Sequence, residues 1–386
     1  MMTRSMRWVM VAAWSSLAVV LAASASQAQS EDNELLQSTQ TVFRSLSERL
    51  RPSLVRIETV GGTQPTVPLA VDDGDSEAPL RGPQQFVDNP GSNFVVADGP
   101  TTGLVYSTDG YIVSSSYNFA REPALISVVL ADGRRLAADL IARDQVRKIA
   151  LLHVDATDLV VPEWVSQFDV EVGEWAVALG LGFGGQRPSV SVGIISARNR
   201  MVGNAIQTDA KLSPVNYGGP LVDIDGRVIG ISVPMAQRPG ELAGVDMYDS
   251  GVGFVVPKRR VDAIVAELMK GKDIYRGWLG MQLGGQAEDG VYVGRIADPS
   301  PLREAGVIPG DKLWAAEGRP IHHFGQLVQT LYMIPAGTKV HLCMERQGEP
   351  YEVDVVLARN TDLGPLPDFE EPFDPSLPLP GTEGGD

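Results

Sequence analysis

The chain has 386 residues, 44% of them hydrophobic, so it is long enough for two or three folded units with separate cores. Its formal net charge is −16 at pH 7. This acidic balance argues against nucleic-acid binding, which needs a basic surface, and favours solubility. Cys343 is the one cysteine, so an internal disulfide is excluded.

The N-terminus has the features of a secretory leader. Arg4 and Arg7 precede an apolar run from Trp8 to Ala22, and small residues follow up to Ala28. This order predicts a signal peptide over residues 1–28, and therefore an exported protein, periplasmic or secreted. The alternative is a membrane anchor, but the apolar run is short for a membrane span. We expect no stable anchor after cleavage.

Two segments of different character come next. Residues 29–50 form a predicted N-terminal helical segment, with apolar residues at roughly helical spacing: Leu35, Leu36, Val42, Phe43, Leu46 and Leu50. Residues 62–100 mix six prolines with acidic residues and show no periodicity. They predict a long disordered loop.

Residues 101–256 are a succession of short β-type runs separated by turn signals such as Asp109-Gly110 and Asp132-Gly133. Many strands with little helix indicate an all-β sandwich or a pair of barrels. Residues 258–270 carry apolar side chains at i, i+3, i+4 and i+7, which predicts an amphipathic helix that closes this unit.

The C-terminal part divides into a folded unit and a tail. Residues 276–360 mix strand and helix patterns and predict a second domain. Residues 361–386 contain six prolines, seven acidic residues and no basic residue, which is typical of an extended, disordered tail.

Several motifs, in order along the chain, resemble the HtrA family of exported serine proteases. They are Asp109–Val113, Leu130–Arg134, Val172–Gly180, Val192–Ala197, Ile206–Ala210, Gly218–Val222 and Gly251–Pro257. The resemblance implies a mainly β protein, with a trypsin-like double β-barrel over residues 51–271. An α+β PDZ domain over residues 276–360 would follow.

The resemblance also places the three catalytic positions, and none of them holds the family's residue. Tyr117 stands at the position of the general base His, Lys148 at that of the orienting Asp, and Tyr217 at that of the nucleophilic Ser. A phenol with an ordinary pKa near about 10 is a poor base at neutral pH. Lysine has the wrong charge to steady an imidazolium. Val215 replaces a glycine whose amide contributes to the family's oxyanion hole, and a β-branched residue resists the dihedrals that glycine reaches.

Neighbouring residues offer no clear replacement for this chemistry. His153 lies five residues beyond Lys148, about 16 Å along an extended strand, and Ser213 has no evident base. A Tyr–Lys pair is catalytic in unrelated enzymes, but two bulky tyrosines are expected rather to plug the cleft. We therefore predict no catalytic residue.

No cofactor or metal is expected either. The sequence lacks a Cys/His pattern with zinc-finger spacing and a phosphate-binding glycine loop. The glycine-rich run from Gly180 to Gly185 fits a turn between barrel strands.

The second domain resembles a peptide reader. Arg276–Met281 resembles the carboxylate-binding loop of HtrA-type PDZ domains, and residues 324–332 fit the helix that walls the groove. Such domains add an extended peptide to a sheet edge. The predicted groove residues are Trp278, Leu279, Gly280, Met281, Leu327 and Leu331; the alternative is that some of them only pack the core. His322 and His323 precede the helix. They either contact a peptide ligand or belong to an exposed loop.

Three functional interpretations follow. The first is a non-catalytic envelope protein that binds peptide C-termini or unfolded envelope proteins, as a scaffold or chaperone. The second is a regulatory subunit of an active HtrA relative. The third is an endopeptidase with an unorthodox site. Relatives commonly trimerise, so a homo-trimer is also considered.

Overall fold

The structure is a computed structural model that describes residues 33–34, 36–60, 100–119, 123–166, 169–182, 187–235, 251–287 and 290–364. The predicted signal peptide (1–28), nearly all of the predicted loop (62–100) and most of the predicted tail (361–386) lie outside these residues. Residues 36–50 are helical. Among the described residues, no helix has the length and apolar character needed to span a membrane.

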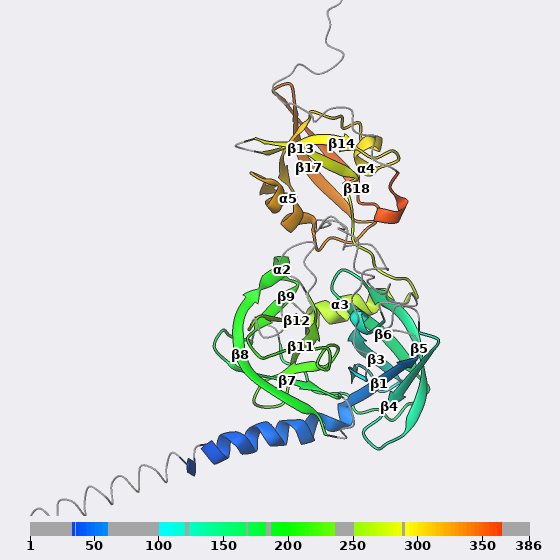
Figure 1. Ribbon diagram of the computed structural model, residues 1–386, viewed down its shortest axis with the longest axis vertical. Helices are drawn as coiled ribbons and strands as arrows, with labels where there is room; N and C mark the ends of the chain where they lie inside the picture. The colour runs from blue at the N-terminus through cyan, green and yellow to red at the C-terminus, as the bar shows by residue number, and fades with distance from the viewer. Residues whose placement is uncertain are drawn as a thin grey trace, which may run out of the picture. The chain divides into compact units, whose positions relative to one another are not determined.

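The first closed barrel has the strand order β1-β2-β3-β6-β5-β4 (Figure 1). Closure pairs every strand on both sides, which leaves no open edge. Its interior packs Ile57, Ile112 and Leu152, all at most 1% exposed. The elements are η1 (Arg51–Ser53), β1 (Leu54–Val60), β2 (Thr101–Val105), β3 (Tyr111–Ser115), η3 (Ser116–Phe119), β4 (Leu125–Val129), β5 (Arg135–Asp144) and β6 (Ile149–Val154).

The second closed barrel has the order β10-β11-β12-β9-β8-β7 and is followed by the amphipathic helix α3 (Figure 1). Helix α3 (Lys258–Leu268) buries Val261, Ile264, Val265 and Leu268, the same apolar positions that its sequence spacing selects. The other elements are β7 (Trp175–Gly180), β8 (Ser189–Asn199), α2 (Arg200–Gly203), β9 (Ala205–Thr208), β10 (Pro220–Val222), β11 (Val228–Val233) and β12 (Gly253–Pro257).

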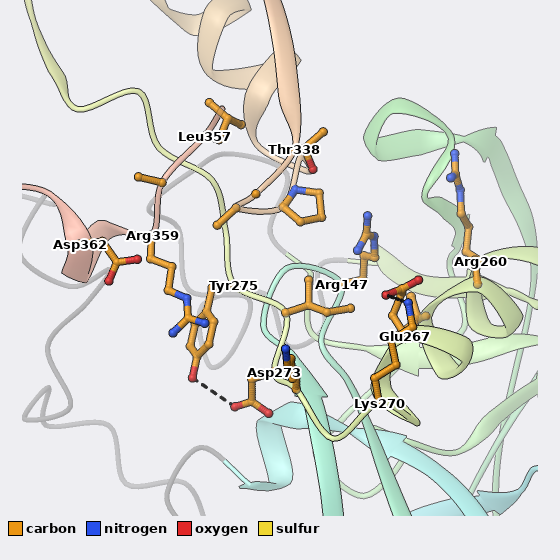
Figure 2. Close-up of a pocket in the computed structure, with 18 residues that line it drawn as sticks. Arg147, Arg260, Glu267, Lys270, Asp273, Tyr275, Thr338, Leu357, Arg359 and Asp362 are labelled. Carbon is orange, nitrogen blue, oxygen red and sulfur yellow. Dashed lines mark hydrogen bonds and ion pairs between the residues drawn. The ribbon is translucent and has the colours of Figure 1, made fainter. Parts of the chain in front are cut away.

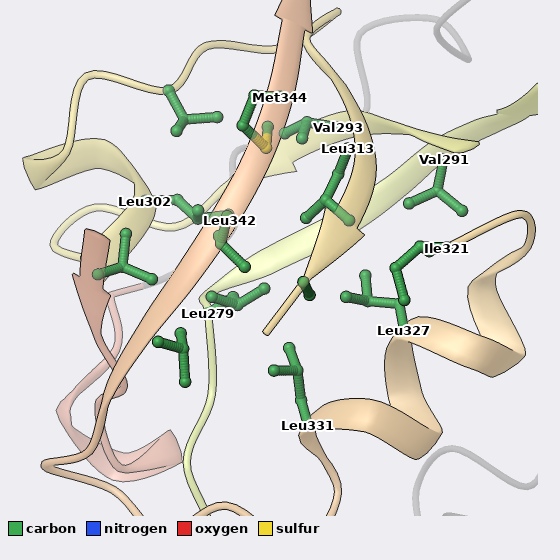
Figure 3. Close-up of a cluster of buried hydrophobic side chains, with 14 of the residues drawn as sticks. Leu279, Val291, Val293, Leu302, Leu313, Ile321, Leu327, Leu331, Leu342 and Met344 are labelled. Atoms are coloured by element: carbon green, nitrogen blue, oxygen red, sulfur yellow. The ribbon is translucent and has the colours of Figure 1, made fainter. Parts of the chain in front are cut away.

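A third sheet follows, ordered β13-β14-β15-β17-β18, with β16 paired to β15. Its apolar face and helix α5 enclose a core that includes Leu313, Leu342 and Met344 (Figure 3). The elements are β13 (Met281–Ala287), β14 (Gly290–Ile296), α4 (Pro301–Glu304), β15 (Lys312–Ala316), β16 (Arg319–Pro320), α5 (Phe324–Leu331), β17 (Lys339–Arg346), β18 (Glu349–Val356) and η5 (Asn360–Asp362). Two barrels and a sheet with helices confirm the predicted fold class.

The segment between α3 and β13 is bonded to the first barrel. Asp273 accepts hydrogen bonds from the backbone amide of Arg143 at 2.7 Å and from its Nη2 at 2.9 Å. Ile274 N donates to Arg143 O at 2.8 Å. Tyr275 Oη also donates to Asp273, at 3.3 Å (Figure 2). The Arg143 guanidinium also donates from Nε to the same Asp273 oxygen at 3.1 Å, so this linker is held by several directed, charge-assisted hydrogen bonds.

A buried carboxylate organises one end of the third sheet. Asp311 is 1% exposed. It accepts hydrogen bonds from Arg346 Nε at 2.8 Å, Tyr351 Oη at 2.6 Å and Ile308 N at 2.9 Å. Burial raises its pKa, but the hydrogen bonds from Arg346, Ile308 and Tyr351 outweigh burial and lower the pKa below its usual value.

We predict that Asp311→Asn destabilises this domain by about 2 kcal/mol at pH 7, because the substitution leaves Arg346 without its carboxylate. The difference from the unsubstituted chain should shrink below about pH 4. A carboxylate with a depressed native pKa stabilises above its unfolded pKa, and this stabilisation is lost as the pH falls through the native value. Urea unfolding at several pH values measures both effects. Glu267→Gln, in the exposed pair with Lys270, is the control and should change stability by less than about 0.5 kcal/mol. Equal effects of the two changes would show that the Asp311 contacts do not stabilise the sheet.

Candidate functional site

Two tyrosine rings from different barrels meet at the candidate site. Tyr117 lies in η3, directly after β3 of the first barrel, and Tyr217 lies in the turn before β10 of the second. Their ring centroids are 5.6 Å apart with an interplanar angle of 79°. This is the edge-to-face arrangement that aromatic pairs prefer. Tyr217 is only 6% exposed and Tyr117 is half-buried.

Lys148 lies beside the turn that carries Tyr117. Its carbonyl accepts hydrogen bonds from Ser116 N at 2.9 Å and from Ser115 Oγ at 3.1 Å. Its φ of 62° lies in the left-handed region, which is costly for a residue with a Cβ. The structure therefore brings the backbone of all three sequence-predicted positions into one neighbourhood, two on the first barrel and one on the second.

The backbone amides of the turn around Tyr217 donate within the protein. Asn216 N donates to Ser213 O at 2.8 Å, and Tyr217 N contacts Ser213 O at 3.2 Å and Pro214 O at 3.3 Å. Gly218 N donates to Ser232 O at 2.8 Å. An oxyanion hole needs amides directed at the place where negative charge develops. The amide of Tyr217 instead closes a helical turn.

The side chain of Val215 packs against Gly182, just after β7. A methyl group placed on Gly182 would meet Val215 Cγ1 at 2.9 Å and Cγ2 at 3.1 Å. The side chain of Val215 therefore occupies the space beside Gly182.

Sequence inspection missed the hydrogen bonds that join the two barrels here. Thr102 Oγ1 donates to Val215 O at 2.6 Å and accepts from Leu181 N at 2.7 Å. Asn118 Nδ2 donates to Tyr217 O at 3.2 Å and to Ser114 Oγ at 3.2 Å. Both side chains are at most 1% exposed. No charge or motif marks either residue in the sequence, because their importance comes from contacts about a hundred residues away.

The two possible replacement residues have other partners. His153 pairs with Tyr111 across the β3–β6 ladder, four positions from the Ser115–Ile149 pair and therefore about 13 Å along it. Its Nε2 lies 3.1 Å from Asp109 O. Ser213 Oγ donates to Asn216 Oδ1 at 3.1 Å. Neither arrangement pairs a hydroxyl with an imidazole.

The predicted groove residues of the third sheet divide into two groups. Leu279, Leu327 and Leu331 lie in its apolar core, 6%, 3% and 9% exposed, and Met281 packs against them (Figure 3). Trp278 makes different contacts: its backbone pairs with Ala358, and the Arg276 guanidinium stacks on its indole at 4.3 Å.

The loop that carries Leu279 and Gly280 has little freedom. Gly280 has a φ of +77°, and a Cβ there would lie 2.5 Å from Ser300 Cβ, so this position requires glycine. Its carbonyl accepts from Ala297 N at 2.9 Å. Strand β13, which follows, pairs only with β14 among the described strands. Its other edge is the kind of surface to which an extended peptide can add.

A hollow around the linker contains five basic side chains, Arg147, Arg260, Lys270, Lys272 and Arg359 (Figure 2). Four of them already have partners within the chain. Arg147 pairs with the buried Asp144 at 2.8 Å, and Lys270 pairs with Glu267 at 2.7 Å. Arg260 Nε donates to Gly203 O at 3.3 Å, and Arg359 lies over the Tyr275 ring at 4.4 Å.

Two family models match the chain. Residues 101–231 match the trypsin-like peptidase domain, and residues 277–357 match the PDZ domain. A probable periplasmic serine endoprotease, DegP-like, of Hahella chejuensis is 30% identical over 352 residues, which are 84% of this chain and 70% of that protein. The protein of the same description in Brucella suis is 32% identical over 305 residues, 74% of this chain and 57% of the relative. The chain thus spans little more than half of some relatives.

Solved structures show the same fold. The serine endoprotease from Yersinia pestis matches 82% of this chain and 97% of its own, with a TM-score of 0.56 and 22% identity. The HtrA-type protease AlgW with a decapeptide matches 83% of this chain and 98% of its own, with a TM-score of 0.55 and 22% identity.

We predict that Thr102→Val destabilises the double barrel by about 1–3 kcal/mol, because it leaves the amide of Leu181 and the carbonyl of Val215 without their buried partner. Thr102→Ser retains the hydroxyl and is the matched control, with a smaller expected loss. Denaturant unfolding measures both variants. A Ser variant as unstable as the Val variant would mean that methyl packing, and not the hydrogen bonds, makes Thr102 important.

Proposed function

We propose that this chain is a non-catalytic member of its family. The chain belongs to the HtrA/DegP family of serine endoproteases, with a trypsin-like and a PDZ domain. In this proposal residues 51–271 keep the protease fold without its chemistry. Residues 276–360 bind peptides or unfolded proteins of the cell envelope, and the protein acts as a scaffold or chaperone.

The contact between Tyr117 and Tyr217 carries the first half of the proposal. A serine protease needs a hydroxyl nucleophile and an imidazole base within hydrogen-bonding distance. The family's positions for these two groups hold aromatic rings whose centroids are 5.6 Å apart. In this proposal the two rings fill the space that an attacking group and a scissile carbonyl would need.

The backbone supports the same conclusion independently of the triad. The amide of Tyr217 is directed at the carbonyls of Ser213 and Pro214, and Val215 replaces a glycine next to it. Oxyanion-hole donors contribute about 3–4 kcal/mol to the stabilisation of the transition state. Relatives of this chain are named serine endoproteases, so the proposal makes this chain a member that has lost the activity its relatives are named for.

The PDZ domain supports the second half of the proposal. One solved structure of similar fold is that of the HtrA-type protease AlgW with a decapeptide. In this chain β13 has an edge that no described strand covers, and the Gly280 loop is held rigidly beside it. A rigid loop and an open strand edge are what peptide addition to a sheet requires.

The location follows from the leader and the relatives together. Residues 1–28 have the pattern of an export signal, and the relatives are named periplasmic. We therefore assign the chain to the periplasm.

We predict that Tyr217→Ser alone restores no protein hydrolysis, because Tyr117 and Lys148 still occupy the base and carboxylate positions. Release of fluorescent fragments from labelled, unfolded casein measures this, with trypsin as the positive control. Tyr217→Ala, which has no hydroxyl, is the matched variant. Hydrolysis by the Ser variant that the Ala variant lacks would contradict the proposal, since it would require a functional base in the present site.

We also predict that the full chain binds extended peptides that end in an apolar residue with a free carboxylate. Amidation of the same peptide should weaken binding by about tenfold or more, because it removes the charge-assisted hydrogen bonds to loop amides. Fluorescence anisotropy with the paired peptides measures the ratio. Equal affinity of the free and amidated peptides, or no saturable binding of either, would overturn the assignment of the PDZ domain as a reader of C-termini.

A further inference from the structure

A group of metal-ligating side chains lies on the hairpin formed by β17 and β18, outside the sites described above. In the antiparallel register His341 stands opposite Asp354, and Cys343 stands opposite Glu352. Residues two apart on a strand share a face, so all four side chains project from the same side of the hairpin. The ligand atoms of His341, Cys343 and Glu352 lie within 4.8 Å of one another.

The imidazole of His341 is oriented by a second carboxylate. Its Nδ1 lies 2.9 Å from Asp354 Oδ1, and the other oxygen of Asp354 lies 2.6 Å from Lys339 Nζ. Nε2 lies 3.6 Å from Glu352 Oε2. A neutral ring that donates from Nδ1 presents the lone pair of Nε2 to Glu352. A carboxylate that fixes a histidine in this way is the usual outer partner of a metal-binding imidazole.

We propose that His341, Cys343 and Glu352 bind a zinc-class divalent cation, with Asp354 as the residue that positions His341. Zinc takes nitrogen, thiolate and carboxylate ligands at about 2.0–2.3 Å, which places neighbouring ligand atoms of a tetrahedron about 3.3–3.8 Å apart. The Nε2–Oε2 distance of 3.6 Å already fits. The other distances between ligand atoms are at most 4.8 Å. Rotation of these side chains shortens them without a change in the β17–β18 backbone. Water takes the fourth position.

The charges around the cluster suit a cation and also set a limit on affinity. Burial and the charge of Glu352 raise the pKa of the Cys343 thiol, and the hydrogen bond that the His341 ring donates to Asp354 raises the pKa of His341. Glu317, which accepts a hydrogen bond from His341 N at 2.7 Å, adds a third nearby carboxylate. Metal binding must displace the thiol proton and any imidazole proton. Affinity should therefore fall as the pH is lowered.

Occupation of the site would join the last two strands of the PDZ sheet. His341 and Cys343 belong to β17 and Glu352 belongs to β18, so a bound cation bridges the hairpin. A ligand that binds only the native state raises the unfolding temperature. The site does not depend on catalysis or on peptide binding, and it is tested separately from both.

The test is titration of the untagged, reduced full chain with Co²⁺ and then Zn²⁺. We expect one equivalent of Co²⁺ to produce a thiolate-to-metal absorption band in the near ultraviolet, Zn²⁺ to remove it, and Zn²⁺ to raise the unfolding temperature. Cys343→Ser should abolish the band. Glu352→Gln, at an exposed position, should weaken Zn²⁺ binding. Asp354→Asn should weaken it by about 10–100-fold, as expected for an outer partner.

His322→Ala and Glu349→Gln are the matched controls, a histidine and a glutamate of the same domain outside the cluster, and both should bind as the unsubstituted chain does. Absence of the band in the unsubstituted chain would overturn the proposal. Zn²⁺ affinity that is equal in the unsubstituted, Cys343→Ser and Glu352→Gln chains would also overturn it, because binding would then be adventitious.

Discussion

The contact between the rings of Tyr117 and Tyr217 is the constraint on which the functional interpretation depends. Each ring comes from a different barrel, and the two meet edge to face. In a trypsin-like fold the space between the barrels is where base, nucleophile and substrate converge. Here two aromatic rings meet, and the proposal is that the fold is retained while the groups that would use it for catalysis are absent.

The surrounding hydrogen bonds explain how the fold tolerates this change. Thr102 and Asn118 connect the first barrel to the Val215–Tyr217 turn through bonds to main-chain carbonyls. Such bonds do not depend on which side chains occupy the catalytic positions. The double-barrel fold is therefore stabilised by buried polar contacts and by closure of the two barrels.

Much of the fold could be predicted from the sequence, because Asp-Gly turns, short β-type runs and the spacing of Val261, Ile264, Val265 and Leu268 are local signals. The three triad positions rest on the resemblance of the motifs along the chain to those of the family, and their assignment stays a prediction. The Thr102 and Asn118 contacts could not be predicted, because they join residues about a hundred positions apart. The direction of the Tyr217 amide and the packing of Val215 on Gly182 depend on the exact path of the turn. The cluster of His341, Cys343 and Glu352 could not be predicted either, because only the register of β17 and β18 brings these residues together.

The most direct test of the non-catalytic assignment is hydrolysis of an unfolded protein by the unsubstituted full chain, compared with the Tyr217→Ala variant. The proposal predicts that neither protein releases fragments above the buffer rate, while an active serine protease in the same assay does. Hydrolysis by the unsubstituted chain that disappears in Tyr217→Ala would contradict the assignment, since it would show that Tyr217 takes part in a working site.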